Sequence, residues 1–395
     1  MKKASVKELI SLIGTDILDE AAAMYKVDYN VKKLRGEVVF KLLLMSLLDN
    51  GKMSLRMMEH LYNGEKFKLF AGLKQEDSIR HSSLSDRLCN IEASYFKRIF
   101  DQTVAICRER LQQDNGQDKY NIRQFDSTTV SASAKLLASG MVNGLKSKDV
   151  EHRHKQIKFT VSLYKKLPAQ SFLYSGQKHL AEDLTLKESI LKTAIGEDEI
   201  AVFDRGLKSR KTFQEFTRNG ISFVTRINPT KSIKVLHTNE LCTTQTDTLE
   251  LISDETVELF YGDKRKLKEP FRLIKARAKA TGECMFFLTN IEQLPASSIT
   301  EIYKQRWQIE VFFKFLKQHL HLKHFFSYSE NGIAVMMYMS MIAALLLLLY
   351  KQENNIAGYK IAKYSFIAEL DMEIVREIVL ICGGDPSKST LFNKT

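Results

Sequence analysis

The sequence predicts a mixed α/β protein, with a sheet flanked by helices, a helical region before it and a mostly β insertion within it. Two observations support this fold class. Up to about residue 115, apolar residues recur with the period of an α-helix, and no proline interrupts them. From about residue 119, runs rich in β-branched and aromatic residues alternate with helix-like runs, which is typical of strands packed by helices.

A second change in the sequence pattern divides the chain further. At about residue 228 the alternation gives way to several strand-like runs with few helix signals, and helices resume near Pro295. The expected parts are a helical N-terminal domain (1–115), the first part of an α/β core (116–227), a β-rich insertion (228–292), the second part of the core (293–350) and a helical C-terminal part (351–395).

Composition and charge limit the classes of protein that fit. Lys and Arg number 59 against 47 Asp and Glu, a net charge of +12 that favours a polyanionic partner. The five cysteines are scattered without C-x-x-C spacing, which argues against a disulfide framework or a zinc site. The N-terminus has no secretory signal pattern. We expect a cytoplasmic protein of a reducing compartment.

One apolar segment raises the alternative of a membrane protein. Residues 333–350 carry no charge and reach the length of a spanning helix. The segment stands alone and directly follows a helix with a polar stripe, and its methionines suit an irregular packed interior. We therefore expect a buried core helix and no membrane. Recovery only in the membrane pellet after a high-salt wash would favour the alternative.

Two aspartates occupy positions where α/β folds place their chemistry. Asp126 lies in QFDSTT, within or at the end of an expected strand, and Asp204 closes the apolar run IAVFD. Ligands of open α/β sheets bind outside the carboxyl ends of the strands. Taken alone, each aspartate also suits the start of a turn or the cap of a helix.

A third carboxylate lies in the aromatic-rich stretch 303–317. Taken as one α-helix, this stretch gathers its polar residues in a stripe roughly 60° wide: Tyr303, Arg306, Glu310 and Lys317. An i,i+4 ion pair between Arg306 and Glu310 accounts for the glutamate without any further function. Convergence of Glu310 with the two aspartates is the other interpretation, and it predicts a metal site.

Converging carboxylates have a specific chemical consequence. They repel one another, and proteins normally neutralise them with divalent cations. Ligand sets made only of oxygen favour Mg²⁺ or Mn²⁺. Two such ions about 3.5–4 Å apart activate a water or a 3′-hydroxyl and stabilise the leaving oxygen at phosphorus. We therefore predict Asp126, Asp204 and Glu310 as catalytic metal ligands, with Mg²⁺ as the cofactor and Mn²⁺ as a substitute.

The spacing in the third stretch resembles a known family signature. Tyr303-x2-Arg306-x3-Glu310-x6-Lys317 is similar to the Y-x2-R-x3-E-x6-K signature of a large group of bacterial insertion-sequence transposases. That group belongs to the DDE, ribonuclease H-like superfamily. DST at residue 126 and DRG at residue 204 also resemble its two aspartate motifs. The resemblance covers roughly residues 119–350 and includes a β-rich insertion before the glutamate.

The resemblance implies an activity, partners and further site residues. It implies a transposase that binds terminal inverted repeats and cuts and joins double-stranded DNA, including target DNA, with Mg²⁺. Synapsis of two DNA ends implies a homodimer, and the protein would be associated with the bacterial nucleoid. Tyr303, Arg306 and Lys317 would contact phosphates near the cleavage site. Neighbouring basic residues are expected to bind DNA as well: Lys314, Arg205, Lys208 and Arg210.

Two features leave alternatives open. Well-studied relatives use a tryptophan of the insertion to stack on a flipped base. Here the only tryptophan is Trp307, so a hairpin intermediate would need another platform, such as Phe260, Tyr261 or Phe271. The carboxylates also do not specify strand transfer, so a ribonuclease H-like nuclease and a catalytically silent DNA-binding protein are the other interpretations.

Overall fold

A computed structural model describes most of the chain, which forms two compact units. The described residues are 4–49, 54–112, 119–133, 140–142, 154–228, 233–261, 265–320, 322 and 327–388. The first unit comprises residues 1–115, 133–139 and 314–395, and the second comprises residues 116–132 and 140–313. The five-part division expected from the sequence remains a prediction, since these two units separate the chain by packing and not by function.

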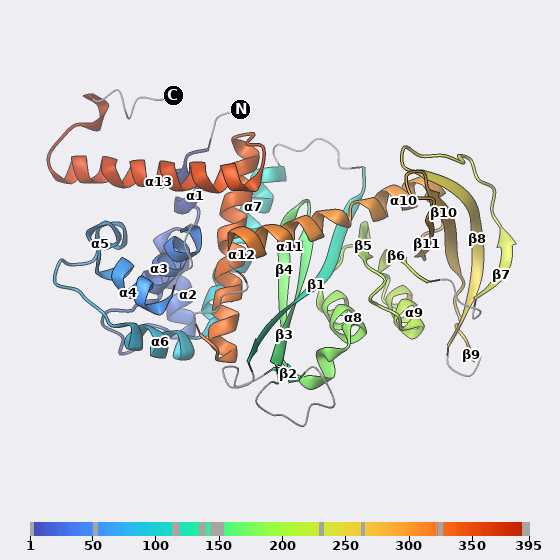
Figure 1. The fold of residues 1–395 in the computed structure, drawn as a ribbon, viewed down its shortest axis with the longest axis horizontal. Coiled ribbons are helices and arrows are strands. Elements are labelled where there is room, and N and C mark those ends of the chain that lie inside the picture. The colour runs from blue at the N-terminus through green and yellow to red at the C-terminus, as the bar shows by residue number, and fades with distance from the viewer. Residues whose placement is uncertain are drawn as a thin grey trace. The chain divides into compact units, whose positions relative to one another are not determined.

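The first unit is helical and packs around one apolar helix. Its helices are α1 (Val6–Ser11), α2 (Thr15–Tyr25), α3 (Gly36–Leu48), α4 (Leu55–Asn63), α5 (Glu65–Ala71), α6 (His81–Asn90), α7 (Ala93–Gln112), α12 (Glu330–Glu353) and α13 (Tyr359–Ile381), with a 3₁₀ turn at Pro386–Lys388. Helix α12 contacts α7, α3, α6 and α13 (Figure 1).

Residues 333–350 lie within α12, and almost all of their side chains are buried. The helix begins after Ser329, whose side chain accepts a hydrogen bond from the N–H of Gly332 at 3.0 Å. By length and composition alone α12 could cross a membrane, and 89% of its most apolar window is buried inside the protein. Its position agrees with the core helix that the sequence predicts.

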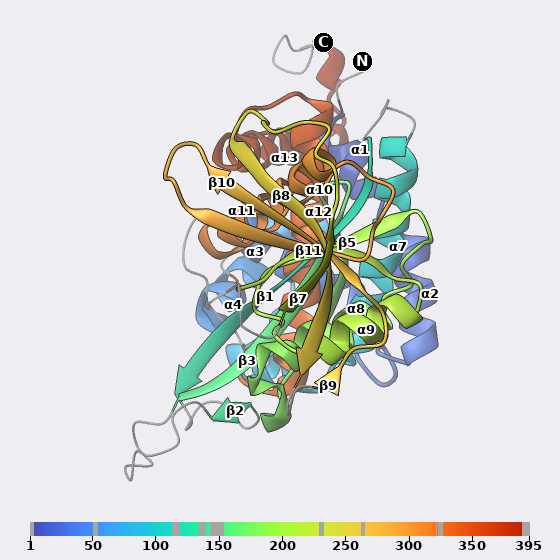
Figure 2. The same ribbon diagram turned by 90° about the vertical axis from the view of Figure 1, so that its right-hand side faces the viewer.

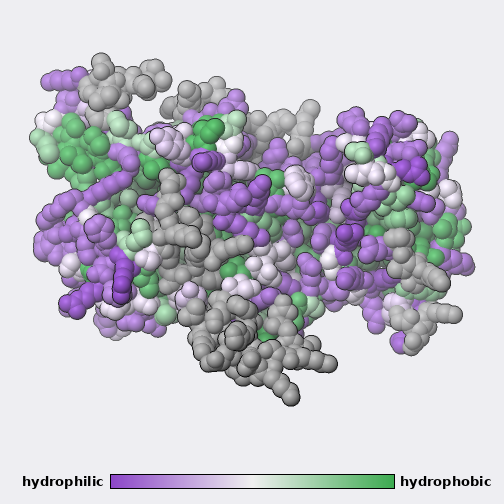
Figure 3. Space-filling model, viewed as in Figure 1, coloured by the Kyte–Doolittle hydropathy of each residue, from purple (hydrophilic) through white to green (hydrophobic). Residues whose placement is uncertain are grey.

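Helix α13 is apolar on more than its inner face. Phe366, Leu370 and Ile374 are buried, while other apolar side chains point outward: Ile361, Tyr364, Met372, Val375, Ile378, Leu380 and Ile381. The hydropathy surface shows hydrophobic side chains gathered over this helix (Figure 3). This half-buried helix therefore contributes both to the core of its unit and to an exposed apolar surface.

The second unit is built on one large mixed sheet. Its strands are β1 (Asn121–Ser133), β2 (Met141–Val142), β3 (His154–Tyr164), β4 (Leu167–Tyr174), β5 (Glu199–Phe203), β6 (Ser222–Arg226), β7 (Ile233–Thr238), β8 (Leu249–Tyr261), β9 (Arg265–Lys266), β10 (Phe271–Ala278) and β11 (Cys284–Thr289). The order is β2-β3-β1-β5-β6-β11-β10-β8-β7, with β4 beside β3 and β9 beside β8.

The expected β-rich insertion continues this sheet. Strands β1, β5 and β6 pair in parallel, and β11 then joins β6 in antiparallel fashion. The remaining insertion strands add to β11 in turn, and the strands fan out across a strongly twisted sheet (Figure 2). The mixed α/β class predicted from the sequence is confirmed.

Helices cover both faces of the parallel strands. On one face, α8 (Glu182–Lys192) and α9 (Arg210–Arg218) bury a cluster that includes Phe125 and Phe203. On the other, α10 (Ala296–Lys304) packs Ile299 and Ile302 over Val202 and its neighbours. Because successive side chains of a strand alternate between faces, residues next to the phenylalanines point away from the α8–α9 cluster.

The stretch 303–317 is not the single helix assumed from its sequence. Helix α10 ends at Lys304, and α11 (Trp307–His319) begins three residues later. The junction has hydrogen bonds over three residues: Arg306 N–H to Tyr303 O and Gln308 N–H to Gln305 O, both 3.0 Å. This tighter turn replaces the α-helical ladder, so the expected stripe is divided between two helices.

Candidate active site

The register of two parallel strands brings the predicted aspartates together. Phe125 of β1 pairs with Phe203 of β5, so Asp126 and Asp204 follow as neighbours. Asp126 accepts a hydrogen bond at Oδ1 from the N–H of Ser127 at 2.7 Å. Asp204 accepts one at Oδ1 from the N–H of Gly206 at 2.9 Å. The two carboxylates therefore occupy the end of β5 and the adjoining part of β1.

A glutamate that the sequence analysis missed lies beside them. One carboxylate oxygen each of Asp126, Glu182 and Asp204 lies within 4.8 Å of the others. Glu182 is the first residue of α8. In the sequence its only signal is a pair of acids, AED, at the start of a helix, which also suits favourable interaction with the helix dipole.

Two of the three carboxylates, those of Asp126 and Glu182, have raised pKa values. Burial, followed by the negative charge of Asp204, raises the pKa of Asp126 from 3.8 to about 7. The Ser127 N–H and the positive charge of Arg306 oppose that shift. Burial and Asp204 also raise the pKa of Glu182. Such a cluster is unfavourable when all three carboxylates are ionised without a cation between them, so binding of a cation would stabilise it.

The predicted glutamate is close to this centre but engaged elsewhere. Glu310, in the first turn of α11, is not within the 4.8 Å carboxylate group found among the described residues. Its Oε1 accepts a hydrogen bond from Arg306 Nη2 at 2.5 Å. Arg306 also interacts electrostatically with Asp126. The arginine thus connects Glu310 to the aspartates, and the i,i+4 ion pair considered from the sequence is present.

Tyr303 completes this group at the end of α10. Its ring centroid lies 5.6 Å from Cζ of Arg306, and its hydroxyl is a hydrogen-bonding neighbour of that arginine. Burial raises the pKa of Tyr303, whereas the positive charges of Arg306 and Arg226 lower it. Tyr303 is therefore a neutral hydrogen-bonding group at neutral pH. The structure brings Tyr303, Arg306 and Glu310 together.

The other predicted DNA-binding residues lie on two elements. Lys314 and Lys317 follow Glu310 by four and seven residues on α11, and Lys314 is exposed. Trp307, at the start of this helix, is 64% exposed, so it is not a core residue. Arg205, Lys208 and Arg210 instead lie between β5 and the start of α9.

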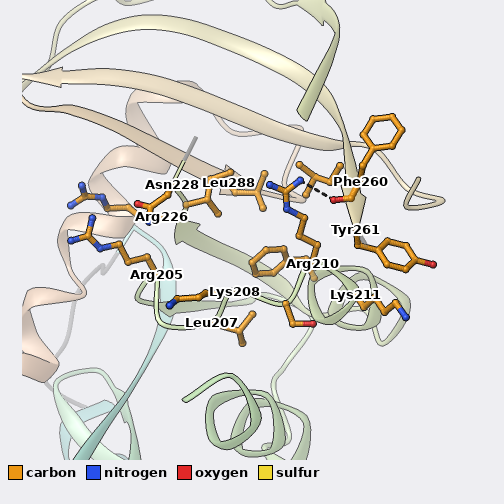
Figure 4. Close-up of a pocket in the computed structure, with 14 residues that line it drawn as sticks. Arg205, Leu207, Lys208, Arg210, Lys211, Arg226, Asn228, Phe260, Tyr261 and Leu288 are labelled. Carbon is orange, nitrogen blue, oxygen red and sulfur yellow. Dashed lines mark hydrogen bonds between the residues drawn. The ribbon is translucent and has the colours of Figure 1, made fainter. Parts of the chain in front are cut away.

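These three cations line a pocket of about 560 Å³. Arg226 and Lys211 also line it, together with Phe260 and Tyr261 (Figure 4). Arg210 Nη1 donates to the Phe260 carbonyl at 3.0 Å, across the pocket from Arg205 and Arg226 (Figure 4). Lys211 Nζ lies 4.5 Å from the centroid of the Tyr261 ring. The pocket therefore combines positive charge with aromatic faces.

The geometry decides among the aromatic platforms considered from the sequence. Phe271, the first residue of β10, is only 2% exposed and packs in the core cluster beneath α9, so it cannot stack on a base. Phe260 and Tyr261 are half-buried and line the pocket. Only these two of the three predicted candidates have an accessible aromatic surface.

The donor set fits a hard divalent cation. Asp126, Glu182 and Asp204 offer only carboxylate oxygen, which is the ligand that Mg²⁺ and Mn²⁺ prefer. Burial and the nearby negative charge of Asp204 raise the pKa of Asp126, and a bound cation would offset both effects. These residues therefore suit Mg²⁺ or Mn²⁺ better than Zn²⁺, for which sulfur and nitrogen ligands are usual.

Comparison with known proteins shows similarity to transposases. Residues 176–346 match the family described as transposase DDE domain. A Sinorhizobium fredii protein named as a transposase is 31% identical over 155 residues, 39% of this chain and 43% of that protein. The transposase of insertion sequence element IS4SA from Synechocystis is 29% identical over 58% of this chain and 60% of that protein.

A third relative and a solved structure extend the comparison. The transposase of insertion sequence element IS5377 from Geobacillus stearothermophilus is 24% identical over 76% of this chain and 79% of that protein. The chain thus spans about half the length of the first two relatives and more of this one. The piggyBac transposase, solved as a synaptic complex with hairpin DNA, aligns with a TM-score of 0.50 and 11% identity over 95% of this chain and 82% of that chain, which shows a shared fold.

The mixed sheet flanked by helices has a ribonuclease H-like fold, and residues 176–346 of the chain are similar to the transposase DDE domain. The chain is similar to bacterial insertion-sequence transposases of the DDE superfamily, which agrees with the resemblance found in its sequence.

Proposed function

We propose that the protein binds the terminal inverted repeats of a transposon, cleaves DNA strands there and joins the freed 3′-hydroxyl ends to target DNA. The observation that carries this proposal is the carboxylate group beside Arg306 and Tyr303, within a chain that is similar to DDE transposases. Carboxylates beside cations are suited to phosphodiester chemistry, where one set of groups holds metal and the other holds phosphate.

Asp126, Asp204 and Glu310 would hold the divalent metal, Mg²⁺ with Mn²⁺ as a substitute. The metal would activate the attacking hydroxyl or water and stabilise the leaving oxygen at phosphorus. Glu310 accepts a hydrogen bond from Arg306 at Oε1, and opening of this hydrogen bond would free the whole carboxylate for the metal. Opening that ion pair would also free Arg306 to bind a phosphate, so the same change would release the glutamate for the metal and the arginine for DNA.

Cations around the carboxylates would bind the DNA backbone. Arg205, Lys208 and Arg210 line the pocket beside Asp204. Arg306 interacts electrostatically with Asp126, and Tyr303 with Asp204. Lys314 and Lys317 extend the positive charge along α11. Phosphate contacts of this kind position DNA without reading its sequence. The net charge of +12 supports the same partner.

The proposal includes a homodimer in the synaptic complex, because joining two transposon ends requires two active centres held together. It also includes a cytoplasmic, nucleoid-associated location. Light scattering of the protein with and without DNA carrying one end tests the first of these. A complex with two protein chains and two DNA ends is expected, and a complex of one chain with one end would contradict it.

DNA with the flanking inverted repeats tests the activity itself. Incubation with Mg²⁺ should give strand cuts at the repeat ends and joined products, and EDTA should abolish both. Cuts without any joined product would favour a nuclease on the same fold. Binding without cuts in Mg²⁺ or Mn²⁺ would favour a catalytically silent DNA-binding protein.

A further inference from the structure

Glu182 is held beside Asp204 by contacts of its own helix start. Its neighbour Asp183 accepts hydrogen bonds at Oδ1 from the backbone N–H groups of Lys208 and of Ser209, the latter at 3.3 Å. On the other side, Lys158 Nζ donates to the Leu180 carbonyl at 3.0 Å. These contacts fix the first turn of α8 against the loop that follows Asp204, so the position of Glu182 is built into the fold.

The loop also leaves room for this carboxylate. An ideal Cβ at Gly206 would lie 2.6 Å from Cδ of Glu182 and 2.9 Å from Oδ1 of Asp204. Any side chain at residue 206 would therefore displace the glutamate from the aspartate. The glycine allows two negative groups to approach each other, which costs free energy unless a cation lies between them.

Glu182 also lacks a direct counter-ion within the described part of the chain. No hydrogen bond or ion pair is formed by its carboxylate with any described residue, and Lys158 and Lys208 act on it only at longer range. Glu188 of the same helix differs, since it contacts Lys192 at 3.0 Å and His179 at 3.2 Å. Of these two glutamates of α8, Glu182, which lies beside Asp204, is therefore the one without a direct ion pair.

We propose that Glu182 is a further ligand of the divalent metal, which it holds together with Asp126 and Asp204. The proposal rests on the metal-dependent function proposed above, and it adds a residue outside the predicted Asp126, Asp204 and Glu310 set. In the DNA-free protein, Glu182 serves as the third carboxylate while Glu310 is paired with Arg306. Metal can therefore bind before the Arg306–Glu310 ion pair opens.

Calorimetric titration of the full, DNA-free chain with Mn²⁺ tests this assignment without any assay of activity. Glu182→Gln should weaken Mn²⁺ binding by roughly tenfold or more, as loss of a metal-site residue commonly does. Glu188→Gln, on the same helix, should leave the affinity within about twofold of wild type. Asp204→Asn should weaken binding at least as much as Glu182→Gln.

Two further results keep the proposal open to refutation. Gly206→Ala retains every charge, but its Cβ would displace the carboxylate of Glu182 and would also crowd Oδ1 of Asp204, so it should weaken Mn²⁺ binding as well. It serves as the second variant if Glu182→Gln does not fold. Wild-type Mn²⁺ affinity in Glu182→Gln or in Gly206→Ala, with binding lost in Asp204→Asn, would overturn the role of Glu182. If the metal results hold but no DNA is cut, the proposed function fails while this assignment stands.

Discussion

Arg306 donates a hydrogen bond from Nη2 to Oε1 of Glu310 at 2.5 Å, four residues along the chain. The arginine is largely buried, and it also interacts with the negative charge of Asp126. We therefore expect Glu310 to have two states: it is paired with Arg306 in the metal-free protein, and it is a metal ligand in the active complex. In the metal-free protein the positive charge of Arg306 stands where we expect a metal ion to neutralise the carboxylates.

Glu310→Gln separates these two states. The amide keeps the size of the side chain but is a poor metal ligand, so DNA cleavage in Mg²⁺ should fall by roughly 10²-fold or more. Binding of inverted-repeat DNA should remain measurable in an electrophoretic shift assay. Glu301→Gln, at an exposed position on α10, is the matched control and should cleave like wild type. Full cleavage by the Glu310 variant would refute its assignment as a ligand.

The raised pKa of Asp126 predicts how stability depends on pH in EDTA. Its folded-state pKa of about 7 lies above the ordinary value of 3.8, so the folded protein keeps a proton that the unfolded chain has lost. The stability of the metal-free protein should therefore fall as pH rises from about 4 to about 7. Asp126→Asn should remove part of that fall and should stabilise the metal-free protein at pH 8 by about 1 kcal/mol or more.

Urea unfolding in EDTA at pH 5 and pH 8 measures this effect. The same titration makes metal affinity fall below about pH 7, because the metal must displace the proton from Asp126. A wild-type stability that is equal at both pH values, or that matches Asp126→Asn at both, would contradict the raised pKa of Asp126.

Lys208 should contribute one phosphate contact. It is exposed and lines the cationic pocket beside Asp204. Lys208→Ala should weaken DNA binding about equally for specific and unrelated sequences, and the slope of log affinity against log salt should fall by about 1. Lys279→Ala, at an exposed position outside the pocket lining, should leave the slope unchanged. Equal slopes for both variants would exclude Lys208 from the interface.

A buried ion pair holds the two strands that present the aspartates. Arg123 of β1 contacts Glu199 of β5 through two hydrogen bonds of 2.6 and 2.8 Å, and Arg123 is only 4% exposed. Glu199→Ala leaves a buried guanidinium without its partner and should lower the free energy of unfolding by about 3 kcal/mol. The pair Arg123→Met with Glu199→Leu should recover most of that loss. No recovery in the double variant would show that the loss has another cause.

Much of this arrangement follows from local sequence. QFDSTT and IAVFD each place an aspartate after apolar strand residues, so Asp126 and Asp204 could be predicted. The two aspartates are neighbours because β1 pairs in parallel with β5, in a register that places Phe125 opposite Phe203. The β character of the insertion was likewise visible, whereas its attachment through β11 and β6 depends on a pairing of distant segments.

Glu182 and the break before Trp307 could not be predicted in this way. Glu182 approaches Asp204 because of contacts between α8 and residues more than twenty positions away, and its local sequence shows only an acidic helix start. The turn between Tyr303 and Trp307 has residues that suit a continuous helix, and hydrogen bonds over three residues replace those over four. In both cases tertiary packing decides the outcome.

We infer that the carboxylates at the end of β5 and in the adjoining part of β1 form the centre that cuts DNA. Cleavage of inverted-repeat DNA by Asp204→Asn, normalised to the amount of DNA bound, tests it most directly. We predict that binding is retained and that cleavage in Mg²⁺ falls by roughly 10²-fold or more, with no cuts by either protein in EDTA. Cleavage by Asp204→Asn at close to the wild-type rate would contradict the claim.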